Sequence, residues 1–149
     1  MLIELSTHIN APIERVFDLA RSIDLHLDSM SQTGERAIAG RMSGLIQPGE
    51  TVTWRAKHFG IWQTLTSKIT RFNYPNSFTD EMITGAFKSF THEHLFIAIN
   101  GQTVMKDVFS FESPLGIFGR LANFLFLGDY MTRLLEKRNE VIKRAAEST

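Results

Sequence analysis

The sequence has no cysteine in its 149 residues, which excludes disulfide bonds, thiolate metal sites and thiol catalysis. It also has no excess of either charge, because 16 basic residues balance 16 acidic ones, and this balance provides no attraction for nucleic acid or for an anionic membrane. No segment reaches the ~18 uninterrupted apolar residues of a membrane-spanning helix, and the first ten residues lack the pattern of a signal peptide. We therefore expect a cytoplasmic protein without a membrane span.

The sequence also has few features that would divide it into separate domains. It has four prolines and no linker, repeat or low-complexity tract. Hydrophobic residues make up 43% of the sequence, which is ordinary for a globular protein. A chain of this length buries about 70% of the surface that its unfolded form exposes. These features predict one domain that spans residues 1–149.

The most informative stretch runs from Phe87 to Phe111, where two alternating segments meet at Asn100-Gly101. An Asn-Gly pair between such segments is the strongest short-range signal for a β-hairpin. Side chains alternate along a strand, so every second residue counted outward from the turn lies on one face. That face is apolar except for His92, His94 and Asp107. The predicted pairs are Ala98 with Thr103, Phe96 with Met105, His94 with Asp107, His92 with Phe109 and Phe90 with Phe111.

The remaining elements follow from alternation, turn residues and helical periodicity. Further strands are expected at residues 2–9, 35–39, 50–58, 61–72 and 77–84. Two short helices should follow the first strand, one with Asn10 as its cap and Pro12 in its first turn, the other over residues 23–28 with Ser22 as its cap. A long final helix is expected from about residue 115 to 147, and its inner face carries Leu121, Leu125, Gly128, Met131, Leu135, Ile142 and Ala145.

This order of elements predicts an α+β fold, in which a curved antiparallel sheet of six to seven strands wraps around the C-terminal helix. Such an arrangement leaves a cavity wherever side chains do not fill the space. An aromatic wall with a few converging polar groups is typical of a small-molecule pocket. The candidate ligand-binding residues are Trp54, His58, Asp80, Phe90, His92, His94, Phe96, Met105, Asp107, Phe109, Leu121, Leu125, Gly128 and Met131.

The polar group formed by His92, His94 and Asp107 has two interpretations. As catalytic residues, Asp107 would orient and charge His94, which would transfer a proton to or from a bound carbonyl compound. As structural residues, they would form a buried hydrogen-bonded pair that holds two strands in register, and we favour this interpretation. The same three residues match the ligand set of a non-haem iron site. Their apolar neighbours offer few hydrogen bonds to support metal ligands, so we expect no metal and no cofactor.

Three other polar residues are harder to place from the sequence. Asp80 lies two residues from both Phe78 and Met82 and therefore shares their face of the strand, so we expect Asp80 rather than Glu81 to face the cavity. His58 lies on the strand face of Trp54, where it would contact a ligand or lie in water at the open end of the sheet. His26 has no partner that the sequence reveals, and we expect it at the surface.

Several segments, spread over essentially the whole chain, match a known family. They are Ala11-Pro12-Ile13-Glu14-Arg15-Val16-Phe17-Asp18, Phe78-Thr79-Asp80-Glu81, Gly85-Ala86-Phe87-Lys88, His92-Glu93-His94-Leu95-Phe96, residues 103–107 and Leu134-Leu135-Glu136-Lys137-Arg138-Asn139. These segments resemble the START-like superfamily (SRPBCC, helix-grip) and, more narrowly, its bacterial branch described as ligand-binding or cyclase/dehydrase-like. The resemblance implies a helix-grip fold with a hydrophobic cavity for lipids, sterols, polyketides or other aromatic small molecules, but not catalysis, because the superfamily contains carriers, receptors and enzymes.

Three functions remain open at this point. We favour non-catalytic binding of a hydrophobic small molecule. The alternative is a polyketide cyclase or dehydratase that uses His94 and Asp107 as acid and base. A further alternative is an interaction module with a filled core, whose apolar helix (Phe118, Phe124, Phe126 and Leu127) docks a partner or forms a homodimer.

Overall fold

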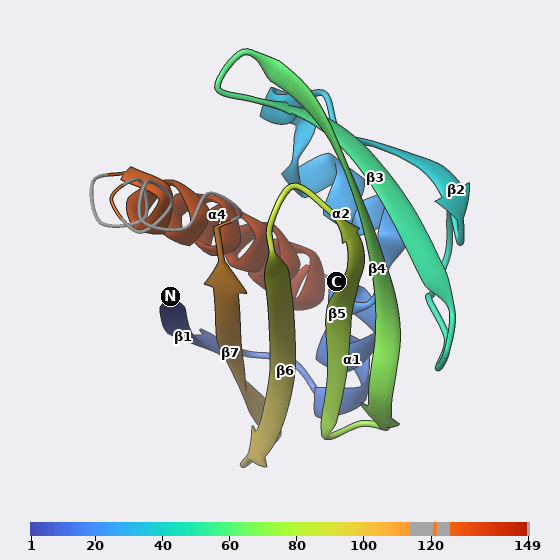
Figure 1. Ribbon diagram of the computed structural model, residues 1–149. Coiled ribbons are helices and arrows are strands. Elements are labelled where there is room, and N and C mark those ends of the chain that lie inside the picture. The colour runs from blue at the N-terminus through green and yellow to red at the C-terminus, as the bar shows by residue number, and fades with distance from the viewer. Residues whose placement is uncertain (114–120, 122–125, 149) are drawn as a thin grey trace.

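The computed structural model describes residues 1–113, 121 and 126–148, which form a seven-stranded antiparallel sheet curved around a long helix (Figure 1). The strands lie in the order β1-β7-β6-β5-β4-β3-β2. The elements in chain order are β1 (Leu2–Ile9), α1 (Ile13–Ala20), α2 (Ile23–Ser29), a 3₁₀ turn (Ser31–Thr33), β2 (Arg36–Gly40), β3 (Thr51–His58), β4 (Ile61–Asn73), β5 (Ser77–Gly85), β6 (Ser89–Ile99), β7 (Gln102–Glu112) and α4 (Gly128–Glu147). The predicted helix-grip fold is therefore confirmed.

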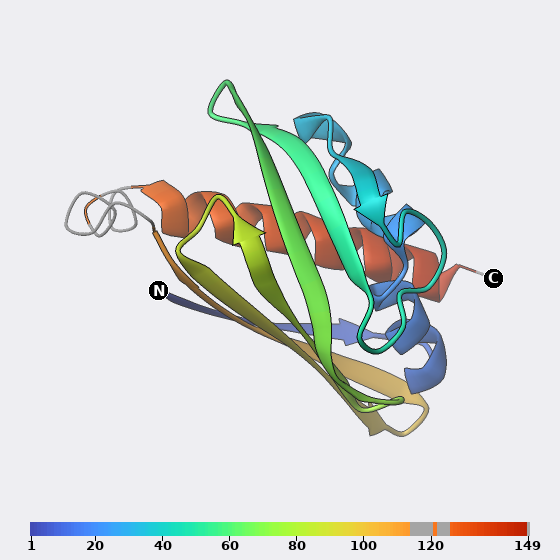
Figure 2. The ribbon, with the colours of Figure 1, turned by 45° about the vertical axis from the view of Figure 1, so that its right-hand side comes forward.

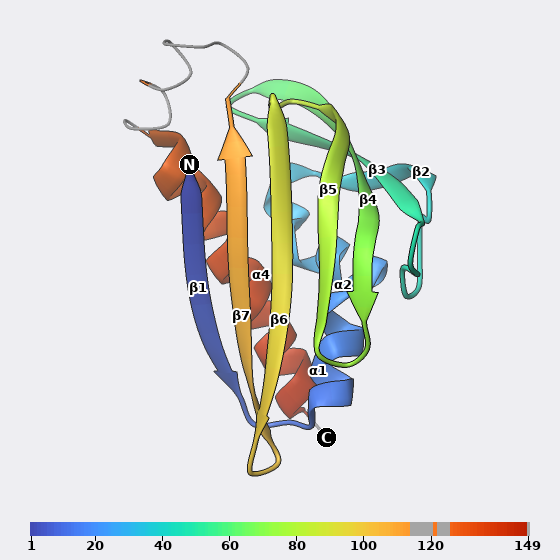
Figure 3. The same cartoon turned by 60° about the horizontal axis from the view of Figure 1, so that its bottom comes forward.

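Helix α4 lies along the concave side of the sheet, and α1 and α2 lie on that same side (Figures 2 and 3). None of the helices in the described part of the chain is long and apolar enough to cross a membrane. The arrangement follows from burial, because a sheet of this size must cover one face with apolar helix surface.

The central hairpin has the predicted register, with all five predicted pairs opposite one another across β6 and β7. Asn100 and Gly101 have φ values of 51° and 78°, as a type I′ turn requires at both central positions. Because this turn fixes the register, it also decides which side chains of β6 and β7 face α4.

The two short helices begin differently from one another. The Ser22 hydroxyl accepts a hydrogen bond from the Leu25 N–H at 3.2 Å, which confirms it as the cap of α2. The prediction of Asn10 as the cap of α1 is wrong, because Pro12 occupies that position and no side chain caps the helix. The Asn10 N–H instead donates to the Glu147 carboxylate at 2.8 Å, which ties the end of β1 to the end of α4.

The long C-terminal helix is confirmed from Gly128 to Glu147, while residues 114–120 and 122–125 lie outside the described residues, and with them Leu125, Phe118 and Phe124. Leu135 and Ile142 are buried as predicted, but Ala146 is buried in place of Ala145. The inward placement of Leu121 is also wrong, because its side chain is 55% exposed. Residues 126 and 127 are π-helical, and the regular α-helix begins at Gly128.

One end of the sheet is closed by a packed aromatic core. The fully buried Phe17 of α1 places its ring 5.1–5.3 Å from those of Phe72, Phe78 and Phe96. Phe96 and Met105 belong to this core, because they lie near the hairpin turn under α1. The described residues leave space for a ligand toward the other end of the strands.

Candidate functional site

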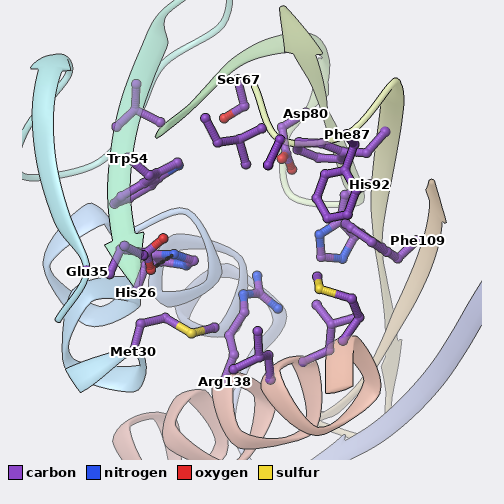
Figure 4. Close-up of a pocket in the computed structure, with 18 of the residues that line it drawn as sticks. His26, Met30, Glu35, Trp54, Ser67, Asp80, Phe87, His92, Phe109 and Arg138 are labelled. Carbon is purple, nitrogen blue, oxygen red and sulfur yellow. Dashed lines mark hydrogen bonds and ion pairs between the residues drawn. The ribbon is translucent and has the colours of Figure 1, made fainter. Parts of the chain in front are cut away.

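A pocket of about 340 Å³ lies between the concave face of the sheet, α2 and the first half of α4. Phe87, Phe90 and Phe109 line it from the side of β6 and β7, and Trp54 lines it from β3. Figure 4 shows Asp80 and His92 on one side of this space, His26 and Glu35 on the other, and Arg138 between them. The pocket thus has a largely apolar lining with polar groups at two places.

The first polar group is a buried network of six side chains from three strands and one helix. Asp107 is fully buried, and its Oδ1 accepts a hydrogen bond from His92 Nε2 at 2.7 Å. His94 Nε2 donates to Asp80 Oδ1 at 2.6 Å. The imidazole rings of His92 and His94 pack together with centroids 3.7 Å apart. Two His–Asp pairs are therefore stacked side by side on the sheet.

The predicted pairing of Asp107 with His94 is wrong at the level of side chains, although the two backbones are opposite each other. His94 leans toward β5, where its ring stacks on Phe78 with centroids 4.1 Å apart. Each histidine therefore bonds the carboxylate diagonal to it, a neighbour that long side chains can reach. The closest approach of His94 Nδ1 to Asp107 Oδ1 is 3.6 Å.

Arg138 and Asn139 complete this network from α4, and both are buried. Arg138 Nη1 donates to Asn139 Oδ1 at 2.8 Å and approaches Asp107 Oδ1 at 3.4 Å. Arg138 Nη2 donates to His94 Nδ1 at 3.2 Å and to the Ala20 carbonyl at 3.3 Å. Asn139 Nδ2 donates to Asp107 Oδ2 at 2.6 Å. The network therefore joins the sheet to the helix that covers it.

The hydrogen bonds define where the protons are. Burial alone would raise the pKa of Asp107, but the hydrogen bond from His92 and the charge of Arg138 lower it well below the ordinary carboxyl value. Burial and the neighbouring His92 lower the pKa of His94 to about 4. Since arginine has only donors, His94 Nδ1 must be a lone pair, and the single proton of the neutral ring lies on Nε2, facing Asp80.

The same donor pattern bears on metal binding. Asp80, His92 and His94 bring three potential ligand atoms within 4.8 Å of one another. A metal would require the lone pair of His94 Nε2, yet the guanidinium on Nδ1 keeps the proton at Nε2. Ligating histidines usually donate their second nitrogen to an acceptor, whereas this one accepts from a cation. The residues present do not fit a metal site.

A second polar group lies across the pocket. His26 Nε2 is 2.9 Å from Glu35 Oε2, and its ring packs against Trp54 with centroids 4.3 Å apart. The expectation of a surface position for His26 is wrong, because its side chain is only 26% exposed. His58 Nδ1 lies 2.5 Å from the Tyr130 hydroxyl. Burial lowers the pKa of His58, and burial with the Glu35 charge raises the pKa of Tyr130.

The structure brings together only part of the predicted ligand-binding set. The residues of that set that line the pocket are Trp54, His58, Asp80, Phe90, His92, His94, Phe109 and Met131. Phe96 and Met105 lie in the closed core, Asp107 lies behind His92, and Gly128 is buried beside the pocket without lining it. Leu121 is exposed, and Leu125 lies outside the described residues.

Sequence reasoning missed the helix half of the network, although a signal for it exists. Arg138 and Asn139 lie three and four residues after Leu135 and four and three before Ile142. Those spacings place both on the buried face of an α-helix. A charged residue and an amide within an apolar stripe require buried partners, and the acidic and imidazole groups on the facing strands supply them.

Comparison with known proteins places this geometry in a structural class. No family model matches the sequence, and no curated protein matches it. The chain has the helix-grip fold, in which a curved antiparallel sheet grips a long C-terminal helix, and solved structures share it.

Three solved structures illustrate this likeness over nearly the whole chain. The protein TTHA0849 from Thermus thermophilus aligns with a TM-score of 0.76 at 19% identity, over 99% of this chain and 100% of that one. Ginseng major latex-like protein 151 from Panax ginseng gives 0.71 at 14% identity, over 99% and 98%. CV1439 from Chromobacterium violaceum gives 0.73 at 10% identity, over 99% and 98%. At these identities the likeness concerns the fold.

Proposed function

We propose that this protein binds an apolar or aromatic small molecule, of lipid or polyketide-like character, in the pocket between the sheet and α4. The observation that carries the proposal is the pocket of about 340 Å³, lined by aromatic side chains and closed below by a hydrogen-bonded polar network. This volume falls at the lower end of the usual range for small-molecule sites. Burial of ~200 Å² of ligand would contribute about 5 kcal/mol before the costs of association.

Non-catalytic binding is the simpler function for this site. The acid/base alternative, a cyclase or dehydratase, relied on His94 and Asp107. Both nitrogens of His94 are engaged by protein groups, and Asp107 does not line the pocket. Proton transfer to a bound molecule would therefore fall to His92.

The interaction-module alternative required a filled core, and the pocket argues against it. Phe126 is 54% exposed, so a homodimer through this helix stays a prediction, as does the cytoplasmic location.

The test is to fill the pocket and measure the loss of binding. Ser67 is buried on β4 and points into the pocket (Figure 4), so Ser67→Phe would place a ring there. Ser110 is exposed on β7, and Ser110→Phe is the matched control. We expect the neutral fluorophore 1-aminoanthracene to bind the wild type and Ser110→Phe, and to bind Ser67→Phe at least about tenfold more weakly. Equal binding to both variants, with both folded by circular dichroism, would overturn the proposal.

A further inference from the structure

One hydrogen-bonding atom of the polar network is directed toward the pocket and not toward the protein. His92 is only 6% exposed and lines the pocket. Its Nε2 is bonded to Asp107, but its Nδ1 has no hydrogen-bond partner among the described residues. No fully enclosed side-chain nitrogen or oxygen in that part of the chain lacks a partner. His92 Nδ1 therefore retains some contact with the empty space of the pocket.

The chemical character of that atom follows from the groups behind it. Asp107 is ionised, because the hydrogen bond from His92 and the charge of Arg138 outweigh the effect of burial and lower its pKa. An ionised carboxylate only accepts, so His92 Nε2 must carry the proton that joins them. In the neutral imidazole, Nδ1 is then a lone pair. With a single proton on its ring, at Nε2, His92 offers the pocket a hydrogen-bond acceptor at Nδ1.

The surrounding charges oppose an anionic ligand. Asp80 and Asp107 supply two negative charges against the single positive charge of Arg138. All four terminal N–H bonds of Arg138 are donated within the protein, which leaves only its Nε–H. Across the pocket, Glu35 adds a further carboxylate beside His26, while Arg21 is paired with Asp18. A ligand carboxylate would enter a site with a surplus of carboxylates.

The surfaces beside His92 select the rest of the ligand. Phe109 meets the His92 ring edge to face with centroids 5.2 Å apart, and Phe90 stacks on Phe109 at 5.3 Å. Phe87 and Met131 complete this part of the lining. A flat apolar body packs well on such surfaces, and a polar group on its edge would lie within reach of His92.

We infer that the pocket selects a neutral molecule with a hydroxyl group on a flat apolar body, and that the hydroxyl donates its hydrogen bond to His92 Nδ1. This inference rests on the proposed function and specifies its ligand class. It predicts preference for an alcohol or phenol over its ether, which cannot donate, and over its carboxylate, which is repelled.

The experiment compares three naphthalenes that share one body. 2-Naphthol, 2-methoxynaphthalene and 2-naphthoate are titrated at about pH 7.5 as competitors of 1-aminoanthracene, with the naphthol neutral at that pH. We expect 2-naphthol to bind about tenfold more tightly than the other two. His92→Phe should remove its advantage over the ether. His8→Phe, which changes an exposed histidine of β1 outside the pocket, should preserve that advantage.

A measurement on the wild type guards against a His92 variant that fails to fold. In two-bond ¹H–¹⁵N spectra of the imidazoles, the His92 Nδ1 resonance should move on addition of 2-naphthol and stay in place with 2-methoxynaphthalene. Binding of 1-aminoanthracene without a preference for the naphthol, or with a preference for the naphthoate, would overturn the inference and leave the proposed function intact. Absence of binding by all four molecules would overturn both.

Discussion

Removal of the Arg138 guanidinium should destabilise the protein more than any surface substitution. Arg138→Met keeps much of the aliphatic stem, and the buried site loses four hydrogen bonds. Asp107 keeps its bonds to His92 and Asn139 but loses its cation, and His94 Nδ1 loses its donor. Breaking a buried ion pair from one side costs about 3–5 kcal/mol. We expect the free energy of unfolding to fall by that amount.

The assay is equilibrium unfolding in urea at neutral pH, followed by circular dichroism. With a slope of ~2 kcal/mol per molar urea, the midpoint should fall by about 2 M while the slope stays the same. Arg144→Met is the control, because the pair of Arg144 with Glu140 is exposed and should contribute less than about 0.5 kcal/mol. Asp107→Asn combined with Arg138→Met should cost less than the sum of the two changes. A loss below about 1 kcal/mol for Arg138→Met would refute the reasoning.

Two further predictions concern pH and helix capping. The pKa of His94 is near 6.5 in the unfolded chain and about 4 in the fold. Between these values the unfolded state binds more protons than the folded state. Acidification from about pH 7 to pH 4 should therefore lower the free energy of unfolding by roughly 3 kcal/mol. Urea midpoints measured across that range should fall as the pH falls. His94→Gln should make the midpoint depend less on pH, whereas the control His8→Gln, at an exposed site, should not. An unchanged pH dependence in His94→Gln would contradict the lowered pKa of His94. The lowered pKa values of Asp80 and Asp107 extend the loss below about pH 4. Ser22→Ala should cost about 1 kcal/mol, because the Leu25 N–H loses its acceptor, and a midpoint identical to that of the wild type would show that the cap contributes nothing.

Much of the fold could be predicted because its signals are local. Asn100-Gly101 fixes the hairpin, and from the hairpin the register of β6 and β7 follows by counting. Ser22 marks a helix start through a bond to a residue three positions away. The prediction of Asn10 as a helix cap was wrong because the position of the cap depends on how the chain leaves β1. The Asn10 N–H is bonded to Glu147, at the far end of the sequence.

The candidate site was harder to predict because it depends on directions that a sequence pattern does not contain. The register placed His94 opposite Asp107, yet the direction in which each side chain leans decided the actual pairs, with His92 on Asp107 and His94 on Asp80. The extent of the pocket depends on where α1 covers the sheet, which removed Phe96 and Met105 from its lining. The inward position of Arg138 could have been predicted from the sequence, because Arg138 lies three residues after Leu135 and so shares the buried face of the helix.

The two tryptophans provide the most direct test of ligand binding in the pocket. Trp54 is buried and lines the pocket, whereas Trp62 is 47% exposed and packs under Arg55 without lining it. Each indole N–H gives one ¹H–¹⁵N signal, assigned with Trp54→Phe and Trp62→Phe. On saturation with 1-aminoanthracene, we expect the Trp54 signal to shift and the Trp62 signal to stay in place. A shift of Trp62 alone, or of neither signal, would contradict the proposal that this pocket holds the ligand.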